Sequence, residues 1–330
     1  MKLLSIDGGA TKTVAVLYDV SYEKILGIGL SGPSNFFSAG YENAISNIKS
    51  AMDMAIKDKN EDYEIVMGIA GFGDSERANK IGVDIASKVS KDHKFKIEND
   101  GLCAYRLVNL FNDGAVFAPG TGSIGIYQKN GIIGRIGGWG WFAGDEGSAS
   151  WIARRGLTLA EEQHDGIIDG DSLINVVERY YKLNFSQAIN NLEIDHQKRR
   201  VALMAPWISD LAIKGDKTAL MIINEAADYD ARILGRMSEI ANNNNLGLVG
   251  GTVMAGDILV NNVKKNLKNN GLKTFYGYHV AAGGIILYLM DHGIEIDRNL
   301  RDLIIIDIDK NIKSLDRNII YNNLGIKNIT

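Results

Sequence analysis

Three short segments of the sequence combine glycine with small hydroxyl residues directly after an apolar run. The first runs from Asp7 to Thr13 (DGGATKT) and follows the apolar residues Leu3–Ile6. Glycine lets the backbone come close to phosphate oxygens, and successive backbone N–H groups can cradle an anion. The segment lacks the G-x-x-x-x-G-K-[ST] spacing of a P-loop. Taken alone, it is explained equally well by a tight hairpin that binds no ligand.

The first segment supplies both hydroxyl donors and charge for a phosphate group. Two threonines add hydroxyls and a lysine adds a positive charge. We expect phosphate contacts from Gly8, Gly9, Thr11, Lys12 and Thr13. Asp7 stands at the end of the apolar run, where its carboxylate can hold Mg²⁺ through water.

The other two segments have related compositions. The second, Ala118–Ser123 (APGTGS), places small donors between two apolar runs, and the third, Leu248–Gly256 (LVGGTVMAG), places paired glycines before a helical pattern. A Gly-Gly turn lets a flat adenine or ribose lie against the backbone, although an ordinary strand-to-helix turn also explains it. The residues expected to bind the same ligand are Gly120, Thr121, Gly122, Ser123, Gly250, Gly251 and Thr252.

The apolar runs around these segments predict the same order of strands twice. The runs Leu3–Ile6, Val14–Tyr18 and Lys24–Leu30 predict consecutive antiparallel strands, and three runs between residues 115 and 136 repeat the pattern. We therefore expect a duplicated α/β fold with domains 1–114 and 115–330. The second domain should carry a helical insertion within 146–243, and the last helices should pack back on the first domain. No element is predicted for the tail from residue 291 onward.

Composition narrows the function classes. The 330 residues are 45% hydrophobic, enough for two packed domains, and the net charge of -4 argues against a nucleic-acid partner. The single cysteine, Cys103, excludes an intrachain disulfide and fits a reducing, cytoplasmic location; we expect it to be a buried small side chain. No apolar run is long enough to span a membrane, so no membrane partner is expected.

With the three segments in this order, the sequence resembles the superfamily of actin, heat-shock chaperones and sugar kinases. Three further segments are similar to the narrower group of BadF/BadG/BcrA/BcrD-type ATPases and N-acetylglucosamine kinases: Ser34-Asn35-Phe36, Glu98-Asn99-Asp100-Gly101 and the stretch 137–149 (GGWGWFAGDEGSA). The resemblance implies a duplicated actin-like, ribonuclease H-like fold that binds ATP and Mg²⁺ in a cleft between its domains. It also implies an ATP-dependent sugar kinase, which we expect to be a homodimer.

The stretch 137–149 has the chemistry of a sugar site. Two tryptophans among glycines offer flat apolar surface to the C–H face of a sugar, and Asp145-Glu146 can accept hydrogen bonds from adjacent hydroxyls. The competing interpretation is that the tryptophans belong to the core and that Asp145-Glu146 caps the following helix. The expected substrate contacts are Ser34, Asn35, Asp100, Thr121, Gly138, Trp139, Gly140, Trp141, Asp145 and Glu146.

Asp100 is the expected catalytic residue. By resemblance it matches the aspartate that removes the proton from the attacking hydroxyl. Positioning and electrostatics do most of the work in phosphoryl transfer, so one carboxylate with one Mg²⁺ suffices. Asp100 also reads as the N-cap of a helix that starts at Leu102, and the two roles are compatible.

The sequence leaves open which compound accepts the phosphoryl group. Similar archaeal-type proteins include kinases of 2-keto-3-deoxygluconate, which we place first, followed by N-acetylglucosamine or glucose. A sugar acid requires a nearby cation, for which Arg135 and Arg106 are candidates. An alternative from another class is an ATP-driven activator of a dehydratase or reductase. Such activators hold an iron–sulfur cluster with two cysteines from each subunit, and this chain has only Cys103.

Overall fold

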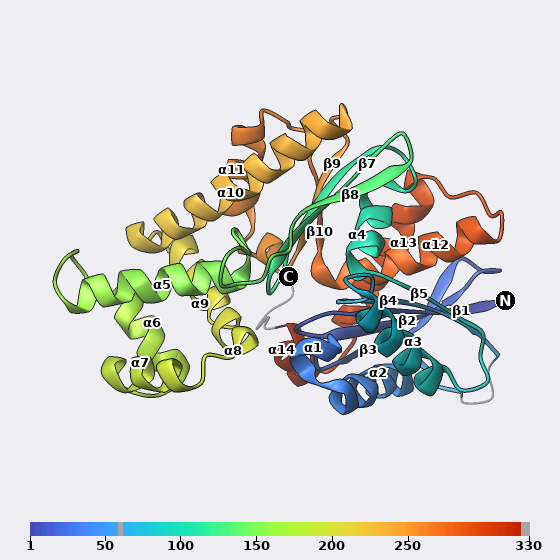
Figure 1. Cartoon of the computed structure of the whole chain (residues 1–330), viewed down its shortest axis with the longest axis horizontal. Coiled ribbons are helices and arrows are strands. Elements are labelled where there is room, and N and C mark those ends of the chain that lie inside the picture. The colour runs from blue at the N-terminus through green and yellow to red at the C-terminus, as the bar shows by residue number, and fades with distance from the viewer. Residues whose placement is uncertain (59–61, 325–330) are drawn as a thin grey trace. The chain divides into compact units, whose positions relative to one another are not determined.

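The chain forms two compact units in the computed structural model, which describes residues 1–58 and 62–324 (Figure 1). The first unit contains Met1–Asn112 together with the segment from Gly277 onward, and the second contains Asp113–Tyr276. The chain thus passes from one unit to the other at two places.

The first unit contains a five-stranded sheet with the order β3-β2-β1-β4-β5. The strands β1 to β3 are antiparallel neighbours, whereas β1, β4 and β5 run parallel. The strands are β1 (Lys2–Gly8), β2 (Thr13–Asp19), β3 (Lys24–Ser31), β4 (Glu64–Ile69) and β5 (Phe95–Glu98). The helical elements are α1 (Phe36–Ala39), α2 (Tyr41–Ala55), α3 (Glu76–Ser90), α4 (Asp100–Asn109), η2 (Gly277–Val280), α12 (Ala281–Asp291), α13 (Arg298–Lys313) and α14 (Arg317–Leu324).

Successive side chains of β1 point to opposite faces of the sheet and therefore pack against different layers. Leu4 and Ile6 pack in a core cluster with residues of α2 and α3, whereas Ser5 donates its hydroxyl to the carbonyl of Ala281 at the start of α12. Side chains two residues apart in a strand share a face. Asp7 therefore lies on the face of Ser5, toward the layer that contains α4 and α12, which pack against each other.

The second unit repeats this arrangement. Its sheet has the order β10-β9-β6-β7-β8, with β6 to β8 antiparallel and β6, β9 and β10 parallel. Each central strand, β1 or β6, thus has an antiparallel hairpin on one side and two parallel strands on the other. The strands are β6 (Gly114–Pro119), β7 (Ser123–Lys129), β8 (Ile132–Gly137), β9 (Leu246–Gly250) and β10 (Lys273–Tyr276). The expected duplication is confirmed.

Most helices of the second unit lie between β8 and β9 in the sequence, as expected for residues 146–243. The 25-residue helix α10 buries an alanine-, isoleucine- and leucine-rich face in the main core of this unit. The helical elements are α5 (Ala149–His164), α6 (Ser172–Tyr181), α7 (Phe185–Ile194), α8 (Lys198–Ala202), α9 (Ala205–Ile213), α10 (Lys217–Ala241), η1 (Thr252–Ala255) and α11 (Asp257–Leu267).

The structure adds elements that the sequence patterns did not reveal. The tail without a predicted element forms α13 and α14, and α13 buries Ile304, Ile305, Ile308 and Ile312 at helical spacing. The short strand β10 was also missed. The helices α1 and α2 are separated at Gly40, whose φ of 85° is unfavourable for other residues. Within residues 1–58 and 62–324, no helix is long and apolar enough to cross a membrane.

Candidate functional site

The turn between β1 and β2 is tied to the loop that carries Ser34 and Asn35. The backbone N–H groups of these two residues donate to the carbonyl of Gly9, at 3.0 and 3.1 Å. Thr13 Oγ1 lies 2.8 Å from Ser34 Oγ and 2.7 Å from the carbonyl oxygen of Gly32. A Cβ atom on Gly8 would lie 2.6 Å from Ser34 Oγ, so only glycine fits there. The first expected phosphate segment and the first expected sugar segment therefore form one substructure.

Asn35 has a local structural role as well. Its Oδ1 accepts a hydrogen bond of 3.0 Å from Phe37 N, which caps the short helix α1. Because the amide oxygen is engaged in this cap, a contact with a sugar would fall to the amide nitrogen.

Two carboxyl groups, the buried one of Asp7 and the partly buried one of Asp100, lie near each other at the carboxyl ends of the parallel strands. Asp7 is paired with Gly68 of β4 in the sheet register, and a Cβ atom on Gly68 would lie 3.5 Å from Asp100 Cα. Asp100 follows β5 and starts α4. Carboxyl ends of parallel strands are where α/β sheets commonly place ligand-binding groups.

The environment of both carboxyl groups favours the neutral form. Burial raises the pKa of Asp7 to about 7; the charge of Lys12 opposes this rise and that of Asp100 adds to it. Burial also raises the pKa of Asp100 to about 6, against the hydrogen bond from the Gly101 N–H and with a contribution from Asp74. A carboxyl group with a pKa near the operating pH is well matched to general base catalysis.

The helix cap that could have explained Asp100 belongs to its neighbour. Asn99 is the N-cap of α4, and its Oδ1 accepts from Gly101 N at 2.8 Å. The helix starts at Asp100, two residues before the expected start at Leu102, because the Asn99 side chain already satisfies the exposed N–H. Asp100 Oδ1 lies 2.9 Å from the same Gly101 N, so the interpretation of Asp100 as the N-cap is wrong.

The second unit brings its two glycine segments together. The carbonyl of Pro119 accepts a 3.0 Å hydrogen bond from Thr252 Oγ1, and a Cβ atom on Gly250 would lie 2.1 Å from the same carbonyl oxygen. Gly251, in contrast, has no atom within 4 Å of a Cβ position. The turn Gly120–Ser123 and the turn after β9 are therefore in direct contact.

The stretch 137–149 closes over the turn Gly120–Ser123. Ser123 Oγ donates to the carbonyl of Glu146 at 2.8 Å, and Ser123 N donates to Asp145 Oδ1 at 3.1 Å. Gly138 N donates to the carbonyl of Ser123, and Ala149 N donates to the carbonyl of Gly120. The expected phosphate and sugar segments of this unit thus share hydrogen bonds, as their counterparts in the first unit do.

The competing interpretation of this stretch holds only in part. Ser148, not Asp145 or Glu146, caps α5 through a 3.3 Å hydrogen bond from Trp151 N. Trp141 is partly buried against the core of the unit. Trp139 is 75% exposed, and its ring faces the guanidinium of Arg135 at 5.3 Å. Trp139 is thus the tryptophan whose surface is free for an apolar contact.

A cation that the sequence patterns did not single out lies beside Asp145. Lys198, the first residue of α8, donates from Nζ to Asp145 Oδ2 at 2.5 Å. Of the two expected cations, Arg135 lies over Trp139, and Arg106 lies over the Phe111 ring at 4.3 Å in the first unit. Lys198 is 53 residues away from Asp145 in the chain, so no local sequence motif could have predicted this ion pair.

The chain matches the BadF/BadG/BcrA/BcrD ATPase family over residues 4–286. This match includes every site residue described above. The chain belongs to the BadF/BadG/BcrA/BcrD ATPase family.

Two curated relatives of this family member are named as sugar kinases. An N-acetylmuramic acid/N-acetylglucosamine kinase from Clostridium acetobutylicum is 27% identical over 238 residues, which are 68% of this chain and 75% of the relative. An N-acetyl-D-glucosamine kinase from Dictyostelium discoideum is 26% identical over 247 residues, which are 69% of this chain and 76% of the relative.

Solved structures with the same fold confirm the expected two-domain actin-like class. A Chromobacterium violaceum protein described as an N-acetylglucosamine kinase has a TM-score of 0.69 at 20% identity, covering 87% of this chain and 98% of its own. A ROK family glucokinase from Streptomyces griseus, solved with glucose and AMPPNP, has a TM-score of 0.58 at 15% identity, covering 87% and 97%. At these identities the likeness concerns the fold alone.

In this BadF-type chain, one buried carboxyl group near the site has no compensating contact. Asp230 of α10 is fully buried, and neither of its oxygens has a hydrogen-bond partner among the described residues. Gly147 lies against it, since a Cβ atom there would be 1.9 Å from Asp230 Oδ1. Burial raises the pKa of Asp230 well above 3.8. Sequence reasoning missed this residue because it lies within a regular helical pattern.

Asp230→Asn should stabilise the protein increasingly as the pH rises. A pKa raised by folding means that this group contributes stability below its unfolded pKa, and that the contribution is lost toward higher pH. Asn cannot ionise, so it avoids the cost of keeping the buried carboxyl group protonated above its unfolded pKa. The free energy of unfolding should therefore exceed that of the wild type by about 1–3 kcal/mol near pH 8 and by less near pH 4. Urea unfolding at both pH values measures the effect. Asp228→Asn, exposed on the same helix, is the control, and an equal gain at both pH values would contradict the prediction.

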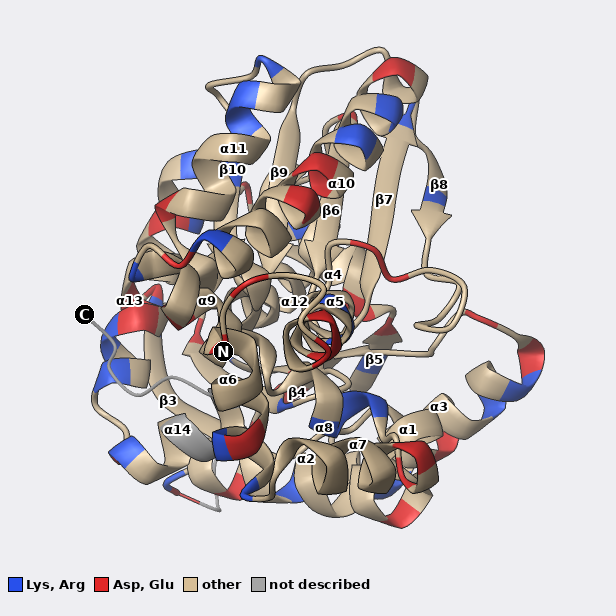
Figure 2. Cartoon of the chain, turned by 90° about the vertical axis from the view of Figure 1, so that its left-hand side faces the viewer, with Lys and Arg blue, Asp and Glu red and all other residues tan. Residues whose placement is uncertain are grey.

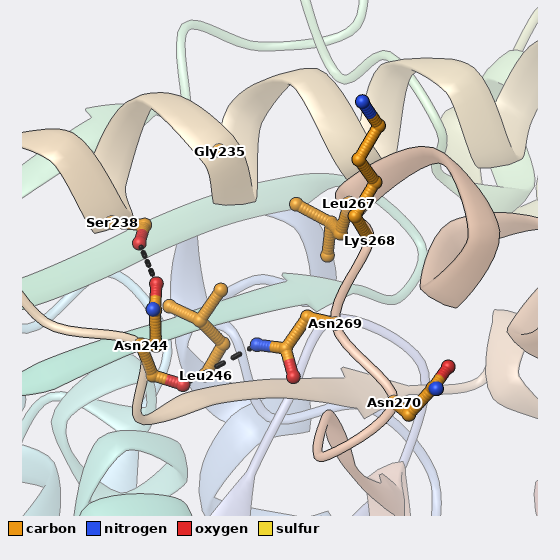
Figure 3. A pocket seen from close by; sticks show the side chains of 8 residues that line it. All are labelled: Gly235, Ser238, Asn244, Leu246, Leu267, Lys268, Asn269 and Asn270. Atoms are coloured by element: carbon orange, nitrogen blue, oxygen red, sulfur yellow. Dashed lines mark hydrogen bonds between the residues drawn. The ribbon is translucent and has the colours of Figure 1, made fainter.

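A separate cavity of about 380 Å³ lies at the other end of β9, between α10 and the loop after α11 (Figure 3). Three of its polar side chains are already paired: Ser238 Oγ donates to Asn244 Oδ1, and Asn269 Nδ2 donates to the carbonyl of Asn244. None of the expected site residues lines it. Leu246 starts β9 at this end, whereas Gly250 ends it at the site.

Proposed function

We propose that this chain is an ATP-dependent kinase that phosphorylates a hydroxyl of a small sugar or sugar acid. The kinase class follows from the family and from the names of its curated relatives. The cluster of Asp7, Lys12 and Asp100 in the first unit is the observation that supports assigning this activity to individual residues. The charge of Lys12 lowers the pKa of both carboxyl groups, that of Asp100 raises the pKa of Asp7, and burial raises the pKa of Asp100 to about 6.

In the proposed reaction, the Asp100 carboxylate accepts the proton of the acceptor hydroxyl. The hydroxyl oxygen then forms a bond to the γ-phosphorus, and the bond from that phosphorus to the bridging oxygen breaks to release ADP. We assign the nucleotide contacts to the turn Gly8–Thr13 in the first unit and to the turns Gly120–Ser123 and Gly250–Thr252 in the second. Lys12 supplies positive charge for the phosphates, which is the electrostatic contribution that phosphoryl transfer requires.

The carboxylate of Asp7 provides an oxygen donor that suits Mg²⁺. This ion prefers oxygen ligands and is usually held by one or two carboxylates together with waters and substrate phosphates. Among the described residues there is no group of three or more His, Cys, Asp or Glu side chains able to hold a metal, which fits an ion that arrives with the nucleotide. When bound, Mg²⁺ would neutralise charge that develops on the phosphates. Ionised Asp7 would be its ligand.

We propose 2-keto-3-deoxygluconate as the first candidate acceptor, followed by N-acetylglucosamine or glucose. The ammonium of Lys198 beside the sugar stretch supports an acidic acceptor. The names of the relatives support an N-acetylated amino sugar, and one of them also includes N-acetylmuramic acid, which carries a carboxylate.

The alternative of an iron–sulfur activator is disfavoured by Cys103. This residue is the one cysteine of the chain, and its thiol is buried. Burial raises the pKa of the Cys103 thiol well above 9.0, so the thiolate that a cluster needs is unfavourable here.

A coupled assay of ADP formation across a panel of acceptors tests the function. The panel contains 2-keto-3-deoxygluconate, N-acetylglucosamine, N-acetylmuramic acid and glucose. We expect ADP formation to depend on an added acceptor and to be fastest with 2-keto-3-deoxygluconate. If no acceptor raises ADP formation above the rate with water, the kinase proposal is wrong; if an amino sugar gives the highest kcat/KM, only the choice of acceptor is wrong.

A further inference from the structure

Lys198 connects α8 to the sugar stretch through an asymmetric ion pair. Its Nζ lies 2.5 Å from Asp145 Oδ2, while Asp145 Oδ1 accepts from Ser123 N at 3.1 Å. The Asp145 side chain is 3% exposed, whereas the Lys198 side chain is 31% exposed. The carboxylate is therefore held from two sides, and the Lys198 side chain remains partly open to solvent.

The same ammonium lies over the turn between β6 and β7. A Cβ atom on Gly122 would lie 2.5 Å from Lys198 Nζ and 2.7 Å from Asp145 Oδ2. Any other residue at position 122 would displace the ion pair. The ammonium is thus placed where the turn assigned to phosphate meets the stretch assigned to sugar.

The hydrogen-bonding capacity of this ammonium exceeds its contact with Asp145. An ammonium group carries three N–H donors, and one of them is directed at Asp145. Basic residues also surround it in sequence: α8 begins Lys198-Arg199-Arg200, and Figure 2 shows the helix as a basic segment. His196 precedes it, with its ring 6.0 Å from that of Trp141. α8 packs against α5, the helix that follows the sugar stretch.

From this geometry we propose that Lys198 is the cation of an oxyanion subsite formed with the turn Gly120–Ser123 and the stretch 137–149. The inference rests on the proposed kinase function for the source of the anion. Two sources share the chemistry: a carboxylate of the acceptor, and the phosphoryl group during transfer. Lys198 also pairs with one oxygen of Asp145, and a carboxylate oxygen can accept a second hydrogen bond, so Asp145 can still accept a sugar hydroxyl while the ammonium binds the anion.

The two sources predict different kinetic results for Lys198→Met, which removes the charge at similar volume. If the anion is an acceptor carboxylate, KM for acidic acceptors should rise about 10–100-fold, and neutral acceptors should be unaffected. If the anion is the phosphoryl group, kcat should fall by a similar factor with every acceptor. Lys214→Met, an exposed lysine after α9, is the matched control and should behave as the wild type.

A second variant guards against loss of folding, since Lys198→Met leaves the buried Asp145 without its cation. Lys198→Gln keeps a hydrogen-bond donor for Asp145 without the charge and should show the same kinetic change. Unchanged kcat and KM in Lys198→Gln would overturn the proposal. A lower KM for all acceptors would also overturn it, because Lys198 would then be a plug that competes with the sugar.

A binding measurement separates this inference from the proposed function. Thermal unfolding of wild type, Lys198→Gln and Lys214→Met is followed with inorganic phosphate and with gluconate, without ATP. At least one anion should raise the Tm of wild type and Lys214→Met but not that of Lys198→Gln. Equal shifts in all three proteins, or no shift in any, would contradict the subsite. The outcome does not depend on whether any acceptor is phosphorylated.

Discussion

Asp100→Asn should lower kcat about 10²–10⁴-fold while the protein still binds ATP and sugar. The change is nearly isosteric and removes only the ability to accept a proton. Because Asn99 caps α4, the helix start does not depend on the Asp100 carboxylate. Steady-state kinetics with the best acceptor, together with calorimetric titration of ATP and acceptor, measures the separation of chemistry from binding.

The pH dependence gives this prediction a second readout. A base with a pKa of about 6 must lose its proton to act. With saturating Mg²⁺ and ATP, which hold Asp7 ionised, kcat/KM for the acceptor should therefore rise with pH through about 6 and level off above it. Asp74→Asn is the control, because the charge of Asp74 raises the pKa of Asp100. It should keep the plateau and move the acid limb to lower pH. A folded Asp100→Asn enzyme with near-wild-type kcat would make this carboxylate structural, and Asp145 would be the next candidate base.

Gly250→Ala should destabilise the second unit and weaken nucleotide binding together. The added Cβ atom would lie 2.1 Å from the carbonyl oxygen and 2.6 Å from the carbonyl carbon of Pro119. A backbone carbonyl cannot rotate away as a flexible side chain can, so either β9 or β6 must shift. Overpacking of this kind costs about 1–3 kcal/mol or more in the free energy of unfolding. The shift would also misalign the turns Gly120–Ser123 and Gly250–Thr252.

Gly251→Ala is the matched control for this effect. Its backbone has a φ of -67° and no atom lies within 4 Å of the Cβ position, so alanine fits without strain. Chemical denaturation and ATP titration of both variants give the comparison. If both variants lose ATP affinity equally while keeping stability, the glycines would act by direct contact with the nucleotide and not by packing against Pro119.

The sequence alone predicted the duplicated fold, and it supplied most of the residues that are proposed for the site. Apolar runs that each end in a Gly/Thr turn specify a hairpin plus a strand in both halves, because alternation and turn chemistry are local properties. The segment at Asp7 was singled out by its local composition, whereas Asp100 and the stretch around Asp145 were assigned by their resemblance to the family. Local patterns did not predict α13. Its three consecutive isoleucines do not follow a helical spacing, and the buried face of the helix is defined only by the residues that pack against it.

Only the tertiary structure determined which side chains of the candidate site contact one another or change one another's pKa. Burial raises the pKa of Asp7 and Asp100, and burial is a property of the folded environment rather than of the residue. The sequence likewise did not indicate that the chain returns to the first unit at Gly277. Asp230 and Lys198 have ordinary sequence contexts, and their proximity to Gly147 and Asp145 arises from contacts between distant segments. Long-range pairs of this kind have no periodicity or spacing that a single sequence could display.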